Sequence, residues 1–129
     1  MSTTLSLPRQ LERISFAKGE TIFRAGDPGS NAYLIEAGRV EISAPQGGGT
    51  VTINTLGPGE IFGEVALIDN RRRTATATAL EDTHAIAIDR TQLESKIAAA
   101  DPLLHMLLRV VLKRFRWALN KALSNERVP

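Results

Sequence analysis

The hydrophobic period of this chain changes once, near Asp89, and this change constrains the fold more than any other feature. Between about 12 and 90, apolar and polar residues alternate in short runs separated by glycine-rich turns, a pattern typical of half-buried β-strands. After Asp89, leucines recur at the helical period. The sequence therefore predicts an α+β fold, with a small antiparallel β-barrel over about 12–90 and helices over about 91–124.

Two local signals place particular elements. Apolar residues alternate on both sides of Ala37-Gly38 within 33–42, which predicts a hairpin with a tight turn. Asp101-Pro102 predicts the start of a long helix, with aspartate as the N-cap and proline at the first helical position. The apolar stripe along that helix predicts packing on the barrel or on a second copy of the helix.

Composition excludes several classes of function. The 129 residues are expected to form one domain, 1–129, and a formal net charge of +2 gives no overall basic field for nucleic acid. The absence of cysteine removes disulfides, iron–sulfur clusters and thiol catalysis, and it is compatible with the cytoplasm. The two histidines, His84 and His105, have no third ligand at useful spacing for a metal, which also excludes a cupin-like metalloenzyme. We expect no membrane segment, because no apolar run approaches the roughly 18–20 residues of a membrane span.

One segment, FGEVALIDNRRRTATATA at 62–79, combines glycine, carboxylate and arginine. Gly63 lets a ligand approach the backbone closely. A short helix is predicted from Glu64 to Leu67, and its first N–H groups favour an anion. Arg73 adds a planar pair of donors that match phosphate oxygens. Because Glu64 would repel a bare phosphate but can accept hydrogen bonds from hydroxyls, we predict a small anionic ligand that carries a sugar such as ribose.

These residues resemble the cyclic nucleotide-binding domain of catabolite activator proteins, cyclic-nucleotide-dependent kinase regulators and gated channels. The phosphate-binding cassette of that family is similar to Phe-Gly-Glu-Val-Ala-Leu at 62–67, a five-residue spacer, and Arg-Thr-Ala at 73–75. Similar stretches at 26–27, 33–40 and 56–59 extend the resemblance over about 10–123. It implies a double-stranded β-helix, a jelly-roll-like barrel. The chain departs from the pattern at Ser30, where many members carry an acid, and we expect that loop to lie outside the site.

The resemblance implies a regulatory sensor that binds cyclic AMP or cyclic GMP, with neither catalysis, cofactor nor metal. Arg73 would pair with the exocyclic phosphate oxygens, and Glu64 would accept from the ribose 2′-hydroxyl. Thr74 would reach the phosphate and, for guanine, its amino group. The implied ligand-binding residues are Ile53, Phe62, Gly63, Glu64, Val65, Ala66, Arg73, Thr74 and Ala75. Cyclic AMP is favoured because it is the commoner messenger among relatives.

The resemblance also implies that the last helix moves over the base. Arg116, Trp117 and Asn120 lie off the apolar stripe, and one hypothesis makes this edge a cap over the base, the alternatives being a surface face or a partner contact. The stripe itself predicts a homodimer through the C-terminal helix. Two further alternatives remain open, a ligand-free assembly module that keeps the fold, and a fragment of a transcription regulator, channel or kinase. We expect no DNA-binding domain in this chain, because a single basic helix is insufficient.

Overall fold

The computed structural model describes residues 11–67 and 72–126, with their side chains except those of 119, 120 and 122–126. The chain forms two compact units, Met1–Arg90 and Thr91–Pro129. The first unit contains the strands of the described chain, and the second contains nearly all of its two longer helices. The boundary falls where the hydrophobic period of the sequence changes.

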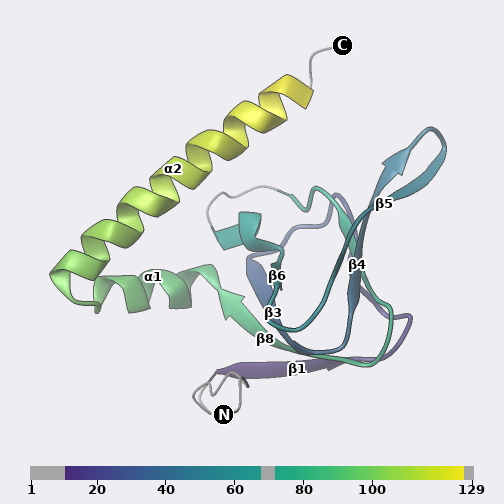
Figure 1. Cartoon of the computed structure of the whole chain (residues 1–129), viewed down its shortest axis with the longest axis horizontal. Helices are drawn as coiled ribbons and strands as arrows, with labels where there is room; N and C mark the ends of the chain where they lie inside the picture. The colour runs from purple at the N-terminus through teal and green to yellow at the C-terminus, as the bar shows by residue number, and fades with distance from the viewer. Residues whose placement is uncertain (1–10, 68–71, 127–129) are drawn as a thin grey trace. The chain divides into compact units, whose positions relative to one another are not determined.

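The described residues form eight strands in two antiparallel sheets of four (Figure 1). The order in one sheet is β1 (Glu12–Phe16), β8 (Thr83–Asp89), β3 (Asn31–Ala37) and β6 (Ile61–Phe62). The order in the other sheet is β2 (Thr21–Phe23), β7 (Thr76–Ala79), β4 (Val40–Gln46) and β5 (Gly49–Leu56). The predicted α+β class is confirmed, with the barrel built as two sheets that do not close by backbone pairing within the described chain.

The predicted hairpin around Ala37-Gly38 is wrong. β3 pairs with β6 and β8, whereas β4 pairs with β5 and β7, so the chain passes from one sheet to the other at this corner. Gly38 has a φ of 102°, and a Cβ there would lie 2.6 Å from the carbonyl oxygen of Asp82. Only glycine fits such a corner. The hairpin lies one strand later, where β4 and β5 pair from Val40↔Leu56 to Gln46↔Gly49.

The hydrophobic core lies between the two sheets. Ile35 and Phe62 of one sheet are buried together with Val40 and Ala77 of the other. Full burial of a side chain such as that of isoleucine contributes about 1.5–3 kcal/mol. The alternation that predicted the strands therefore also selects the face of each sheet that is buried.

Four aromatic rings form a cluster in this core. The Tyr33 ring stacks on Phe62 at a centroid distance of 5.2 Å and on Phe23 at 6.3 Å. Phe16 meets Tyr33 edge-on at 5.8 Å. Such pairs contribute about 0.5–1.5 kcal/mol each beyond the area they bury, so the cluster favours a defined orientation of its rings.

Three helices follow the expected segments. The 3₁₀-helix η1 spans Glu64–Leu67, and α1 spans Arg90–Ala98. The long helix α2 spans Pro102–Glu126, and Asp101 Oδ1 accepts a hydrogen bond from the Leu103 N–H at 3.0 Å, which confirms the predicted N-cap. Within the described chain, no helix is long and apolar enough to cross a membrane.

Candidate functional site

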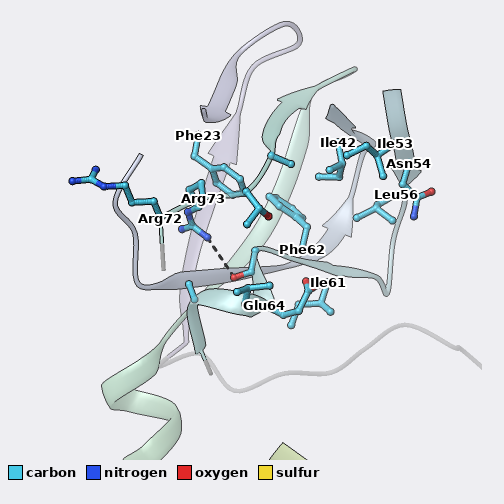
Figure 2. A pocket seen from close by; sticks show the side chains of 15 residues that line it. Phe23, Ile42, Ile53, Asn54, Leu56, Ile61, Phe62, Glu64, Arg72 and Arg73 are labelled. Carbon is cyan, nitrogen blue, oxygen red and sulfur yellow. Dashed lines mark hydrogen bonds between the residues drawn. The ribbon is translucent and has the colours of Figure 1, made fainter. Parts of the chain in front are cut away.

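A cavity of about 250 Å³ opens in the first unit, between the two sheets and η1. Side chains from both sheets and from the segment after η1 line it (Figure 2). The lining residues are Phe23, Ile42, Ile53, Asn54, Leu56, Ile61, Phe62, Gly63, Glu64, Val65, Ala66, Arg72, Arg73, Thr74 and Ala75. The volume is close to the lower end of the range for small-molecule sites, which is about 300–1,000 Å³.

All nine residues that the sequence predicts as ligand-binding line this cavity. The distant Ile53 of β5 lines the cavity together with the cassette residues, and it lies at a register shift that follows the Ile42↔Asn54 pair. Such bulges re-aim side chains. The lining residues that sequence reasoning missed are Phe23, Ile42, Asn54, Leu56, Ile61 and Arg72.

The Arg73 guanidinium is tied to two backbone carbonyls. Its Nη2 donates to the Asn31 carbonyl at 2.8 Å, and its Nη1 donates to the Gly63 carbonyl at 3.3 Å, the dashed line in Figure 2. The backbone of Arg73 is also fixed, because its N–H donates to the Asp27 carbonyl at 2.8 Å. The side chain is therefore pre-oriented against the wall of the cavity.

The charge of Arg73 is partly buried and has no ionic partner among the residues that the structure describes. No described carboxylate lies within ion-pair distance of it, and its buried Nε has no hydrogen-bond acceptor among the described residues. Burial lowers the pKa of Arg73, while Tyr33 and Asp27 oppose that shift. The guanidinium nevertheless remains charged at neutral pH. Because burying an uncompensated charge is costly, this position favours an anionic ligand.

The loop around Ser30 contributes no residue to the cavity lining, but its backbone contacts Arg73. The Asn31 carbonyl accepts from Arg73, and a Cβ on Gly29 would lie 2.5 Å from Arg73 Nε. Ser30 itself turns away, since its hydroxyl donates to Asp89 Oδ1 at 3.3 Å. The loop thus supports the arginine through its backbone, an interaction that side-chain identity does not reveal.

The turn into η1 also depends on backbone geometry. Gly63 has a φ of 73°, and a Cβ there would lie 2.8 Å from Arg73 Nη1. The Ala66 N–H donates to the Gly63 carbonyl at 3.2 Å. Arg90 then holds the far end of η1, because its Nε and Nη2 donate to the Ala66 carbonyl at 2.9 and 2.6 Å. Arg73 and Arg90 therefore hold the backbone near the two ends of η1.

Glu64 is the carboxylate of the cavity wall. It is partly buried at the start of η1, and its side chain forms no hydrogen bond or ion pair with the part of the chain that the structure describes. The carboxylate is therefore available as an acceptor for ligand hydroxyl groups.

The predicted base-cap residues lie in the second unit. Trp117 is 65% exposed, and Arg116 is exposed as well. The side chain of Asn120 lies outside the described residues. The capping role of all three stays a prediction.

Histidine plays no part in the cavity. His84 Nδ1 shares a hydrogen bond with the Ser15 hydroxyl at 2.9 Å, and His105 Nε2 lies 3.3 Å from Arg109 Nε. No group of three metal-ligating side chains occurs among the described residues.

The fold and the cavity define a small ligand-binding domain. The family model of the cyclic nucleotide-binding domain matches residues 13–100, which is more than half of the chain. The chain therefore belongs to the cyclic nucleotide-binding domain family.

Known relatives agree with this assignment. The CRP-like cAMP-activated global transcriptional regulator of Mycobacterium tuberculosis is 36% identical over 117 residues, which are 89% of this chain and 52% of the relative. The cyclic AMP receptor protein of Thermus thermophilus is 36% identical over 108 residues, 83% of this chain and 50% of the relative. The chain thus spans about half the length of the curated relatives it matches.

The fold is also similar to a solved structure, the half-site-occupied form of the EAL enzyme Bd1971. The TM-score is 0.78 at 40% identity, and the match covers 84% of this chain and 97% of that one. Further structures of Bd1971 are described as cAMP-bound and cGMP-bound, with TM-scores of 0.65 and 0.66 at 38% identity. Each covers 91% of this chain and 32% of that one.

Proposed function

We propose that this chain is a regulatory sensor module that binds cyclic AMP, in preference to cyclic GMP, in the cavity beside Arg73. The observation that carries the proposal is the partly buried guanidinium without an ionic partner in the described chain. A cyclic phosphate supplies one negative charge and two exocyclic oxygens, which suit a planar group with several N–H donors. The names of the two curated relatives both refer to cyclic AMP.

The same cavity offers an acceptor for the sugar. Glu64 and Arg73 both line it, so one ligand can place its phosphate on the guanidinium and a ribose hydroxyl on the carboxylate. Apolar side chains such as Ile53 and Val65 line the rest of the wall and suit the sugar and the flat base. We assign a binding role, and no catalytic role, to the side chains of this wall.

Calorimetry with cyclic AMP, cyclic GMP, 2′-deoxy cyclic AMP and non-cyclic AMP tests the proposal. We expect cyclic AMP to bind most tightly. We expect the 2′-deoxy analogue to bind about 10- to 100-fold more weakly, because a charge-assisted hydrogen bond contributes about 1.5–3 kcal/mol. Failure of both cyclic nucleotides to bind would refute the function. Equal binding of the 2′-deoxy analogue would refute only the role of Glu64.

Helix α2 is proposed to close over the base and to transmit binding. A ligand moves this helix only if it binds the closed arrangement more tightly than the open one. Trp117, the sole tryptophan, is largely exposed, so contact with a base would alter its emission. We expect a fluorescence change at saturating cyclic AMP, and an unchanged spectrum would contradict the cap.

The same helix supports a second proposal, a homodimer. α2 exposes a row of large apolar side chains, namely Leu103, Leu104, Met106, Leu107, Val110, Val111 and Phe115. Contiguous apolar patches of this kind commonly mark protein contacts. A second copy of α2 would cover the row, so an assembly role adds to the sensor role rather than replacing it.

A further inference from the structure

Phe23 lies directly against the arginine of the cavity. The Cζ of Arg73 is 4.0 Å from the centroid of the Phe23 ring. The same ring also borders the turn into η1, because a Cβ on Gly63 would lie 3.4 Å from Phe23 Cε2. Sequence reasoning gave no role to Phe23, which ends the short strand β2.

The contact between Phe23 and Arg73 is electrostatically favourable. A guanidinium over an aromatic face is attracted by the ring quadrupole, and the attraction grows when the charge is desolvated. Arg73 is in this situation, because burial lowers its pKa. The ring therefore stabilises a charge that no described carboxylate pairs with.

The contact also leaves the hydrogen-bonding edges of the guanidinium free of the ring. An aromatic ring meets a guanidinium through its face, whereas hydrogen bonds lie in the plane of the nitrogens. A carboxylate at this place would instead occupy N–H donors and neutralise the charge. Phe23 thus contacts Arg73 without neutralising its charge and without occupying any of its N–H donors.

The ring is itself held in place. Phe23 stacks on Tyr33 and packs at 6.0 Å from the Phe62 ring. Its backbone pairs with Ala77 of β7, the strand that follows Arg73 in the chain. Ring and guanidinium are therefore anchored on neighbouring segments, which gives the contact a defined geometry.

We propose that Phe23 is a positioning residue, which orients the Arg73 guanidinium for the phosphate of the ligand by cation–π stacking. This inference rests on the proposed function, because it assigns Phe23 to the same cyclic nucleotide site. It predicts that the effect of Phe23 on affinity depends on the presence of Arg73.

A double-mutant cycle in the full chain, read by calorimetry with cyclic AMP, tests this dependence. Phe23→Leu is expected to weaken binding about 3- to 30-fold in the wild-type background, the range for a partly desolvated cation–π contact. In the Arg73→Ala background it should change affinity by less than about 2-fold, because the contact is already absent there and about 2-fold is the scatter within which unrelated changes add. Ile53→Ala is the matched control, since Ile53 also lines the cavity but lies on β5, at the opposite edge of the sheet from Phe23 on β2. Its effect should be the same in both backgrounds.

Equal losses from Phe23→Leu in both backgrounds would overturn the positioning role and leave a direct or general packing effect. If Phe23→Leu does not fold, Phe23→Met keeps a long apolar side chain without a ring and enters the same cycle. A wild-type chain that binds no cyclic nucleotide would overturn the proposed function and this role together. Wild-type binding with an uncoupled Phe23 would overturn this role alone.

Discussion

Replacing Arg73 with alanine is expected to weaken cyclic AMP binding by about 10- to 100-fold. The estimate follows because a hydrogen bond to a charged group contributes about 1.5–3 kcal/mol and about 1.4 kcal/mol corresponds to a tenfold change in affinity. The loss would arise at the guanidinium that donates to the Gly63 and Asn31 carbonyls beside the cavity. Calorimetry measures the change, with circular dichroism as a check that the variant is folded.

Arg24→Ala is the matched control. Arg24 carries the same charge as Arg73, but its side chain is exposed and it does not line the cavity. We expect this variant to bind cyclic AMP with nearly unchanged affinity. If both variants lost affinity equally, general electrostatic attraction would explain the loss, and the specific role of Arg73 would be refuted.

Gly63→Ala is expected to have a comparable effect on affinity by a different route. The φ of 73° places alanine in a left-handed conformation, which costs about 1–2 kcal/mol of stability. The new Cβ would also lie 2.8 Å from Arg73 Nη1 and 3.2 Å from the Asn31 oxygen. Because the guanidinium is the more mobile partner, it would yield and leave its carbonyl acceptors. Urea unfolding should report the backbone cost, and calorimetry should show at least about a tenfold loss of affinity.

Gly59→Ala separates the backbone cost of the substitution from the displacement of Arg73. Its φ is 86°, but a Cβ there would meet nothing within 4 Å. We therefore expect a similar fall in the free energy of unfolding without the loss of affinity. A Gly63→Ala protein that binds like Gly59→Ala would show that displacement of Arg73 does not matter for the ligand.

Much of the fold was predictable because its signals are local. The alternation of apolar residues marks the strands, and Asp101-Pro102 marks the start of α2, where the Asp101 side chain caps the Leu103 N–H. The wrong hairpin at Ala37-Gly38 has a local cause as well. A turn glycine between two alternating runs looks the same whether the strands pair or separate into two sheets, and only the pairing of β3 with β8 distinguishes the two.

The cavity was predictable where the residues are close in sequence, as from Phe62 to Ala75. Of its remaining wall, only Ile53 was predicted. The Asn31 carbonyl that holds Arg73 is 42 residues away, and a backbone oxygen has no sequence signature. Phe23 likewise resembles an ordinary apolar strand residue until the structure places its ring beneath the guanidinium. Contacts of this kind arise from the tertiary fold rather than from a motif.

The aromatic cluster has a practical consequence for following the protein in solution. Tyr33 is the sole tyrosine of the chain, and it is partly buried, with its ring packed against Phe16, Phe23 and Phe62. Fixed packing around an aromatic ring gives a near-ultraviolet circular dichroism band that disappears when packing loosens. The chain therefore carries a built-in chromophore for the state of its β-sheet interior, which requires no label and is spectrally separable from the tryptophan of α2.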